Sequence, residues 1–426
     1  MREKLKIIGE KLIFLSAIIF SLSLPTSIAL DNVAAGIGIL GLLVYLFSKA
    51  QLSLPPIKPL LFFTIPEFIS SLFNIEMLRK LTKHTDINHH LIPYFVSFKV
   101  FLKKNNNLLL TLLSISTIIS SLSLIFEAFT HQNVKHFNLQ NIHFFLSPMR
   151  ATGFLNHPLT EAGVLYLLFL LFTFLSFKEH RKLYPLTAVL SLIGIILTQS
   201  RSYWLGCGLF TVLLALYNFK YNKRLFTSIS ILLSLTTVIL LSYPPLRYRL
   251  QTIGAVETNT KIDKLTLQSN LDRLTIWNSY LKAFKYEYSP LQLLIGAGEK
   301  GKQLAAKHFE ESFKEIYKRT EPRKEELIHF HGGETHNIYL KFLAKYGILG
   351  LLGYLLFWVY IIYRNLKFSK ILPPLSILSF GYLGFMLAGF FENNFTDAEV
   401  QFTLFFLLGF NFAVIKKLKD KLPSVQ

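Results

Sequence analysis

The sequence contains little that would build a soluble or disulfide-linked protein. Its 426 residues include one cysteine, Cys207, so an intrachain disulfide and a cysteine-rich metal site are both excluded. Charged residues make up 16% of the chain, whereas soluble domains typically contain about 25%. No internal repeat, low-complexity stretch or separate soluble domain is visible. The chain must therefore owe its structure to its apolar residues.

Apolar residues make up 52% of the chain and cluster in blocks. Most blocks are about 17–25 residues long, which is the length that a helix needs to cross a hydrocarbon core of about 30 Å. A soluble core would interrupt such runs with polar residues every few positions. The sequence therefore predicts an all-α integral membrane protein with about 12 transmembrane helices. We expect these helices near residues 12–30, 33–48, 60–75, 87–102, 108–129, 158–177, 184–200, 202–218, 225–243, 336–363, 371–391 and 402–415.

The charge pattern predicts how the helices are oriented. The formal net charge is +20, but the lysines and arginines lie in short tails between apolar blocks and not on one face of a soluble module. We therefore reject nucleic-acid binding. With the N-terminus inside, the short cytoplasmic segments carry 21 basic residues, against six in the short segments on the other side. This bias predicts that both termini are cytoplasmic.

The N-terminal segment has some features of a secretory signal peptide. A basic stretch from Met1 to Lys11 precedes an apolar run that ends at Leu30. That run is long and another apolar block follows at once, so we interpret it as a retained first helix.

This topology divides the chain into three regions. Residues 1–243 would contain transmembrane helices 1 to 9, residues 244–334 a large non-cytoplasmic loop, and residues 335–426 helices 10 to 12 and a basic cytoplasmic tail. The loop carries 15 basic and 12 acidic residues, a mixture that favours a folded segment.

The loop contains two stretches with apolar residues at helical spacing, 270–288 and 302–319. Between them, the glycines of Gly296-Ala-Gly298 predict a turn. The two amphipathic helices would form either a cap over the membrane domain or a wall of an active site.

Four cationic or titratable side chains from different parts of the chain fall at the non-cytoplasmic face, namely Arg150, Arg201, Arg273 and His336. Ionisable groups near the bilayer are costly, which makes them functional candidates. Each has a simpler interpretation as well. Arg201 could snorkel to lipid headgroups, and Arg150 could merely precede a helix. Arg273 could be a solvated residue of an amphipathic helix, and His336 could bond a backbone carbonyl.

The local sequence indicates what two of the arginines could do. Arg201 lies in a hairpin of two or three residues between two apolar helices, where its guanidinium could bind a phosphate with two parallel hydrogen bonds. Arg150 precedes a helix that we expect to begin near Pro158. Gly153 would permit a tight turn before that helix, and Asn156 is its expected cap.

The other two candidates lie in the loop and directly after it. Arg273 follows Asp272, but sequence neighbours on a helix do not face each other, so we expect no ion pair between them. His336 opens a long apolar helix. Because histidine titrates near neutral pH, His336 could take a proton from a hydroxyl group.

A metal site is a further alternative for this histidine. Its ligands would be His329, His331, Glu334 and His336. Histidines two residues apart on an irregular segment form a weak ligand pattern, so we favour the metal-free alternative.

Two short motifs resemble those of bacterial O-antigen ligases. Arg201-Ser-Tyr-Trp-Leu205 is similar to their Arg-x-x-x-Leu motif, and His336 with Gly347 is similar to their His-x(10)-Gly motif. In that family the motifs flank a large loop between the ninth and tenth of about twelve helices, as they are expected to do here. The resemblance covers nearly the whole chain, and it points to the O-antigen ligase and polymerase superfamily and implies a GT-C-like fold.

The resemblance implies a membrane-embedded glycosyltransferase of lipopolysaccharide biosynthesis, which lies in the bacterial inner membrane among its lipids with the active site facing the periplasm. The implied donor is a glycan on undecaprenyl diphosphate, and the implied acceptor is a sugar hydroxyl of lipid A-core. The reaction would be inverting and metal-independent, with no cofactor. Arg201 and Arg273, with Arg150 as a weaker third, would stabilise charge on the pyrophosphate. His336 would deprotonate the acceptor.

Other activities remain open. An O-antigen or exopolysaccharide polymerase would use the same donor with a second lipid-linked glycan as acceptor, and a protein O-oligosaccharyltransferase would use a Ser or Thr hydroxyl. The pairing of the two motifs favours the ligase. A transporter of lipid-linked sugar would place polar sites near the bilayer midplane in interrupted helices. Glu67 beside Pro66, in the third expected span, is the main observation in favour of transport.

Overall fold

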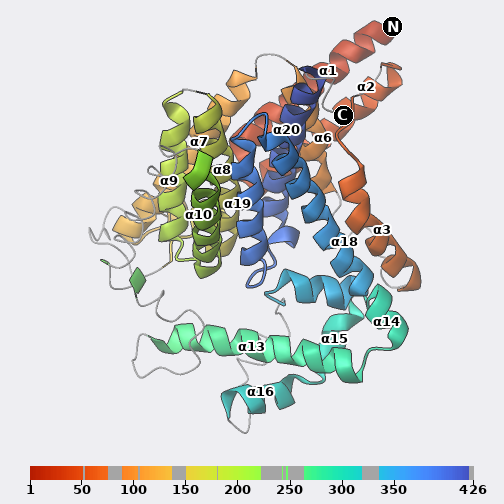
Figure 1. Ribbon diagram of the computed structural model, residues 1–426, viewed down its shortest axis with the longest axis vertical. Helices are drawn as coiled ribbons and strands as arrows, with labels where there is room; N and C mark the ends of the chain where they lie inside the picture. Colours follow the sequence, from red (N-terminus) through yellow and green to blue (C-terminus); the bar gives the residue numbers. More distant parts are fainter. Residues whose placement is uncertain are drawn as a thin grey trace.

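The computed structural model of the chain is a helical bundle with a smaller layer of helices at one end (Figure 1). The structure describes residues 1–50, 53–74, 89–103, 106–136, 150–179, 181–221, 242, 246–247, 263–318 and 335–421. None of these residues forms a β-strand. The prediction of an all-α protein is therefore confirmed for the described residues.

The bundle has its two termini at one end, and the smaller layer lies at the opposite end, which we call the loop end (Figure 1). The bundle helices are α1 (Arg2–Ser23), α2 (Ile28–Phe47), α3 (Lys58–Phe73), α6 (Ile92–Leu102), α7 (Asn107–Thr130), α8 (Pro158–Lys178), α9 (Leu183–Leu197), α10 (Arg201–Tyr221), α18 (Ile338–Ser369), α19 (Leu375–Ala388) and α20 (Ala398–Lys421). The smaller layer contains α13 (Asp263–Tyr286), α14 (Pro290–Ile295), α15 (Lys300–Ala306) and α16 (Phe309–Tyr317).

Five of the described helices, α2, α7, α8, α18 and α20, are long and apolar enough to cross a membrane. The helices α9 and α19 are apolar but shorter. These features are those of a multi-pass membrane protein. The expected span at 225–243 lies, except for residue 242, outside the described residues, and the number of twelve spans stays a prediction.

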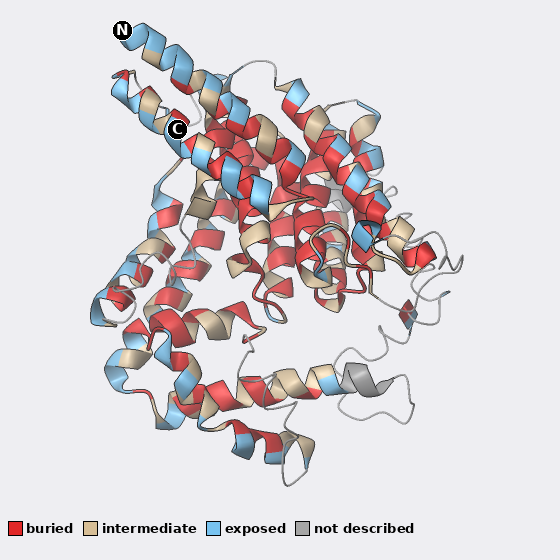
Figure 2. Ribbon diagram, turned by 180° about the vertical axis from the view of Figure 1, so that it is seen from behind, coloured by how far each residue is buried: buried red, intermediate tan, exposed pale blue. Residues whose placement is uncertain are grey.

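The helices α8 and α20 form the centre of the bundle. In their most apolar windows 83% and 89% of the residues are buried, against 33% in α2. Figure 2 shows the buried residues gathered in the middle of the bundle, with exposed residues on its outer helices. The apolar outer faces of helices such as α2 are therefore available to lipid.

The helix α18 departs from the predicted continuous span at 336–363. At Gly347 the backbone has φ 69° and ψ −166°, which breaks the helix. Figure 1 shows the part before Gly347 running across the loop end, while the part after it runs along the bundle. The single predicted span is wrong in this respect, because hydropathy does not register a change in backbone direction.

The broken turn of α18 is the place where the smaller layer joins the bundle. The amide of Ala297 donates to Ala344 O at 3.0 Å, and that of Gly298 donates to Lys345 O at 3.1 Å. A Cβ on Gly347 would lie 2.4 Å from the carbonyl carbon of Leu294. The two backbones approach so closely that only glycine fits at this position. The predicted turn at 296–298 is confirmed, since Gly296 and Gly298 both have positive φ.

The rest of the smaller layer was predicted only in part. The helix expected at 270–288 is α13, but the one expected at 302–319 is wrong in its extent, because the chain turns at Lys307 and His308 between α15 and α16. This turn lets Phe309 and Phe313 pack into a small core with residues of α13 such as Tyr280. The short helix α14 was not predicted. It begins with a capping box formed by Ser289 and Gln292.

Candidate active site

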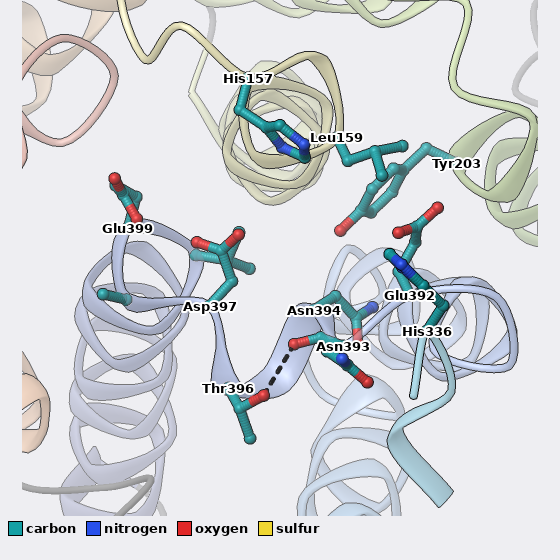
Figure 3. A pocket seen from close by; sticks show the side chains of 12 residues that line it. His157, Leu159, Tyr203, His336, Glu392, Asn393, Asn394, Thr396, Asp397 and Glu399 are labelled. Atoms are coloured by element: carbon teal, nitrogen blue, oxygen red, sulfur yellow. Dashed lines mark hydrogen bonds between the residues drawn. The ribbon is translucent and has the colours of Figure 1, made fainter. Parts of the chain in front are cut away.

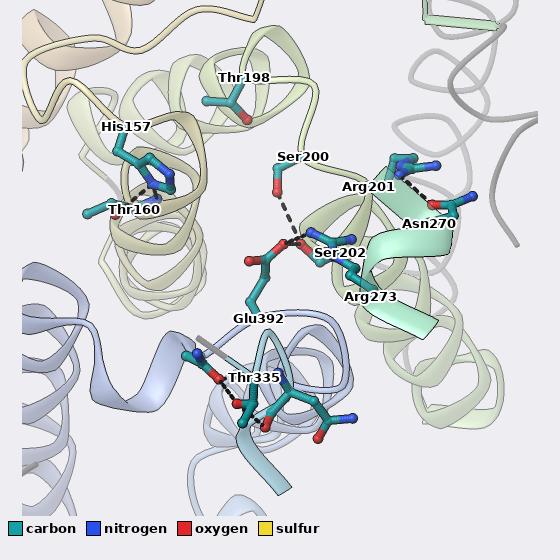
Figure 4. A network of polar contacts seen from close by, with 12 residues as sticks. His157, Thr160, Thr198, Ser200, Arg201, Ser202, Asn270, Arg273, Thr335 and Glu392 are labelled. Carbon is teal, nitrogen blue, oxygen red and sulfur yellow. Dashed lines mark hydrogen bonds and ion pairs between the residues drawn. The ribbon is translucent and has the colours of Figure 1, made fainter. Parts of the chain in front are cut away.

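Arg201 is the first residue of α10 and lies at the loop end of the bundle. Its guanidinium donates to Asn270 Oδ1 on α13 at 2.9 Å (Figure 4). Residues three apart lie on the same face of a helix, so Asn270 and Arg273 both face this part of the bundle. A side chain of α13 thus contacts the start of α10.

Arg273 reaches a buried carboxylate that joins the loop helix to the bundle. Its guanidinium lies 3.0 Å from Glu392 Oε1, between α19 and α20 (Figure 4). The hydroxyl of Ser202 donates to the same oxygen at 3.3 Å. Only 5% of Glu392 is exposed, and this burial raises its pKa. The charges of Arg273 and Arg150 act in the opposite direction and favour the carboxylate.

Arg150 lies against the carboxyl end of α9. Its Nε donates to Thr198 O at 3.0 Å, and the amide of Ala151 donates to Leu197 O at 3.2 Å. The last carbonyls of a helix lack partners within the helix and carry partial negative charge, so they suit a cation. Because its charge also acts on Glu392, Arg150 belongs to the same electrostatic site as Arg273.

The segment that carries Arg150 is held to the bundle by two carboxylates. Glu127 on α7 accepts hydrogen bonds from the amides of Thr152 at 3.1 Å and Gly153 at 2.9 Å. Glu161 on α8 accepts from the amide of Leu155 at 3.1 Å. These bonds fix the backbone between Arg150 and α8.

The predicted turn and cap of this segment can be compared with its backbone. Gly153 has φ 57°, which confirms the tight turn. The cap of α8 is His157, whose side chain accepts from the amide of Thr160 at 3.4 Å. The prediction of Asn156 as the cap is wrong. Asn156 instead adopts a left-handed conformation with φ 60°, which asparagine tolerates better than most residues.

His336 has a left-handed backbone with φ 47°. A non-glycine residue in this region costs about 1–3 kcal/mol and persists only where its surroundings impose it. Here Thr335 Oγ1 donates to Asn393 Oδ1 at 2.8 Å, and the amide of Asn337 donates to the same oxygen at 3.2 Å. The indole of Trp277 on α13 donates to Thr335 O at 3.0 Å. His336 is therefore held by bonds to both of its neighbours.

Phe395 anchors the segment that carries Glu392 and Asn393. Its ring is fully buried, and aromatic rings of α3, α18 and α20 surround it at centroid distances of 5.1 to 6.3 Å. These rings belong to Phe63, Phe342, Tyr354, Phe357, Trp358 and Phe405. A segment anchored in this way can hold its polar side chains in fixed positions at the loop end.

A cavity of about 280 Å³ adjoins this site. His336, Glu392 and Tyr203 line one side of it, and Asp397 lies on the other side near the start of α20 (Figure 3). The remaining lining residues are His157, Leu159, Asn393, Asn394, Thr396, Ala398, Glu399 and Val400. The cavity therefore brings the predicted histidine next to a carboxylate that binds one of the predicted arginines.

The structure thus gathers the residues predicted from the sequence. Arg273 contacts Glu392 directly, Arg150 acts on it electrostatically, and Arg201 directly precedes Ser202, which also bonds Glu392. Asp272 instead accepts a hydrogen bond from Tyr317 at 2.5 Å, so it faces away from Arg273 as expected. Of the alternative metal ligands, His329, His331 and Glu334 lie outside the described residues.

Glu392, Asn393 and Asp397 were not predicted as site residues. The signal was present, because three acidic residues, Glu392, Asp397 and Glu399, fall in one short segment between two apolar spans. The sequence analysis looked for cations that bind phosphate and passed over these carboxylates.

Glu67, the observation in favour of a transporter, lies in an unbroken helix. The helix α3 runs from Lys58 to Phe73 and continues through Pro66. Glu67 is buried, and its Oε1 accepts a hydrogen bond from the hydroxyl of Tyr346 at 3.1 Å. The proline therefore marks no interruption of the helix.

Comparison with known proteins identifies a family. Residues 186–355 match the family model described as O-antigen ligase. A search of curated proteins gives no match. The matched residues include Arg201, Arg273, His336 and Gly347, which are the residues that carry the two motifs and the arginine of α13. The match covers less than half of the chain, and it supports a glycosyltransferase-like enzyme of the O-antigen ligase superfamily that acts on a lipid-linked glycan.

Proposed function

We propose that the protein is an O-antigen ligase. It would transfer a glycan from undecaprenyl diphosphate to a sugar hydroxyl of lipid A-core. The proposal rests on one observation above all. Arg273 binds Glu392 on one side of a cavity, and His336 lines the same cavity. Cations for a pyrophosphate and a base for a hydroxyl thus lie next to each other.

The arginines would bind the donor pyrophosphate. When the bond between the anomeric carbon and the phosphate oxygen breaks, negative charge develops on the departing undecaprenyl diphosphate. Fixed donors aimed at such charge are an efficient means of catalysis. Arg201 and Arg273, with Arg150 behind them, would supply these donors in place of a metal ion. Glu392, held by Arg273 and Ser202, would keep the arginines in position until the donor binds.

His336 would act as the general base. It would take the proton of the acceptor hydroxyl while the hydroxyl oxygen forms the new bond to the anomeric carbon. The electron pair of the broken bond leaves with the diphosphate, so atoms and charges balance. Attack from the side opposite the leaving group inverts the anomeric configuration. General-base help of this kind contributes about 10²–10⁴-fold.

We infer a GT-C-like arrangement in the bacterial inner membrane. The loop end would face the periplasm and both termini the cytoplasm. Residues 1–243 and 335–426 would form the membrane domain of about 12 spans, and residues 244–334 the periplasmic loop. The common position of the termini opposite α13 supports this orientation (Figure 1), as does the distribution of basic residues.

Reconstitution tests the proposal. The purified protein is mixed with undecaprenyl-diphosphate glycan and lipid A-core in the presence of a chelator, and the lipids are separated on a gel. A shifted lipid A-core band is the expected result. A ladder of longer lipid-linked glycans, formed without lipid A-core, would instead identify a polymerase, and transfer to a protein would identify an oligosaccharyltransferase. Movement of the glycolipid across a vesicle bilayer without any transfer would identify a transporter.

A further inference from the structure

The cavity beside His336 has an acidic side. Asp397 and Glu399 come from the start of α20, and His157 lies beside them at the cap of α8 (Figure 3). Glu392 adds a third carboxylate on the opposite side. None of the residues that line the cavity in the described part of the chain is a lysine or an arginine. This environment is the reverse of a phosphate-binding site.

Two oxygen atoms next to the cavity are buried and accept no hydrogen bond of ordinary length and angle within the described residues, although the Tyr203 hydroxyl interacts with Asn394 and the Glu399 carboxyl with Asp397. One is Oδ1 of Asn394, a residue that is 3% exposed and whose Nδ2 donates to Phe385 O at 2.9 Å. The other is Oδ1 of Asp397, whose Oδ2 accepts from Thr160 at 2.7 Å. Buried acceptors are nearly always satisfied, so these two oxygens suit a ligand that brings hydrogen-bond donors.

The positions of the charged groups indicate whether the donor or the acceptor substrate would bind in the acidic side of the cavity. Figure 4 shows Arg201 and Arg273 on one side of Glu392 and His157 on the other. If the arginines hold the leaving diphosphate, a displacement with inversion needs the attacking hydroxyl to approach from the side away from them. Asp397 and Glu399 line the cavity on that side, whereas Glu392, which binds Arg273, lines the side nearer the arginines, with His336 next to it (Figure 3).

We propose that the acidic half of the cavity, formed by Asn394, Asp397, Glu399 and His157, binds the acceptor sugar. It takes an uncharged sugar ring through its hydroxyl groups and disfavours a phosphorylated one. The assignment to the acceptor rests on the proposed ligase function. The preference for an uncharged sugar does not, because it follows from the residues of the cavity alone. Carboxylate and amide oxygens accept hydrogen bonds from sugar hydroxyls, whereas the carboxyl groups of Asp397 and Glu399 disfavour a phosphate. The charge of Glu392 is offset by Arg273.

A binding experiment tests this site without turnover. The full-length protein in nanodiscs is titrated with methyl α-D-glucopyranoside and with glucose 6-phosphate, and binding is followed by saturation-transfer NMR. The substitutions are Asp397→Asn and Glu399→Gln. In Asp397→Asn the amide oxygen would keep the hydrogen bond from Thr160. The amide NH2 group would then replace Oδ1, so the cavity would contain a donor where the proposed sugar needs an acceptor. The matched control is Glu310→Gln, because Glu310 is an exposed residue of α16.

The expected result is that methyl glucoside binds and glucose 6-phosphate binds at least tenfold more weakly. Asp397→Asn should weaken the binding of methyl glucoside about tenfold, a change of about 1.4 kcal/mol in binding free energy. Glu399→Gln should reduce the difference in affinity between methyl glucoside and glucose 6-phosphate. Glu310→Gln should change neither. Equal or stronger binding of glucose 6-phosphate would overturn the proposal, as would the absence of sugar binding or binding that neither cavity substitution alters. Sugar binding of the expected kind, with no transfer to lipid A-core on reconstitution, would overturn only the ligase assignment.

Discussion

The guanidinium of Arg273 lies 3.0 Å from the carboxylate of Glu392, across 119 positions of sequence. Arg273 belongs to the helix of the smaller layer that crosses the loop end, and Glu392 to a segment anchored in the core of the bundle by Phe395. The pair therefore holds the two parts of the site together. It also places a cation where a pyrophosphate is proposed to bind.

Removing one partner of this pair should be more harmful to stability than removing both. Arg273→Met leaves a buried carboxylate without its cation, which we expect to cost about 3 kcal/mol. Glu392→Gln in the same chain removes the stranded charge, so the double variant should recover most of the loss. The measurement is the thermal unfolding midpoint in nanodiscs. Glycosyl transfer should stay low in the double variant, because the arginine is still missing. Recovery of transfer would show that Arg273 serves only to neutralise Glu392.

The stability of Arg273→Met should depend on pH. Burial already raises the pKa of Glu392, and Arg273 opposes that rise, so its removal raises the pKa further. A carboxyl group whose pKa is higher in the folded than in the unfolded chain destabilises the fold at pH values above its ordinary pKa. That destabilisation disappears as the pH falls and the group becomes protonated. The midpoint difference between wild type and Arg273→Met should therefore be larger at pH 8 than at pH 5. An equal difference at both values would mean that Glu392 is not the group responsible.

Arg201→Lys should reduce transfer strongly although the charge is kept. The planar guanidinium of Arg201 can donate to Asn270 with one edge and to a phosphate with the other. The ammonium group of lysine has no such pair of edges. A lost hydrogen bond to a charged group is worth about 1.5–3 kcal/mol, or about 10–150-fold in rate. The measurement is kcat/KM for the donor in the reconstituted assay. The matched control is Arg181→Lys, in the turn between α8 and α9 at the other end of the bundle. Full activity of Arg201→Lys would favour simple anchoring to lipid headgroups.

Gly347→Ala should destabilise the junction between α18 and the smaller layer. The residue has φ 69°, and a Cβ there would lie 2.4 Å from backbone atoms of Leu294. The left-handed conformation alone costs a non-glycine residue about 1–2 kcal/mol, and the contact adds to this. The control is Gly36→Ala in α2, where a Cβ would meet no atom within 4 Å. The unfolding midpoint should fall for Gly347→Ala and stay nearly unchanged for the control. Equal midpoints would mean that α18 does not turn at this residue.

The sequence predicted helices best where a long apolar run has a clear start and end. The span expected at 158–177 is α8, Pro158–Lys178, which begins at a proline and ends at a lysine. The span expected at 12–30 was less accurate, because α1 begins at Arg2 and ends at Ser23, shortly before Pro25. Hydropathy also missed the turn at Gly347. That turn depends on backbone contacts with residues 294–298, which are distant in sequence and therefore invisible to a local pattern.

The candidate site was predicted on its cationic side only. Arg150, Arg201, Arg273 and His336 were found because each is an ionisable residue at an expected membrane boundary. Glu392 escaped because its importance lies in its partner, Arg273, and a pairing across 119 residues leaves no mark in a single sequence. Asn393 escaped for the same reason, since it acts by accepting hydrogen bonds from Thr335 and Asn337.

The proposed role of His336 as a general base can be tested separately from its effect on stability. Its left-handed backbone is tolerated by asparagine but strained for alanine, so the two substitutions remove the same imidazole at different costs in stability. His336→Ala should lose about 10²–10⁴-fold in transfer, and it should also lose stability, since alanine is strained at φ 47°. His336→Asn should lose the same activity with little loss of stability, because asparagine tolerates the left-handed region. Transfer and the unfolding midpoint are measured on both variants. If the imidazole is the base, activity follows its loss in both, whereas the midpoint falls only in the alanine variant. Normal transfer by His336→Asn would mean that the residue serves only to shape the turn before α18. Another group of the cavity would then have to accept the proton, and the carboxylate of Glu392 is a candidate.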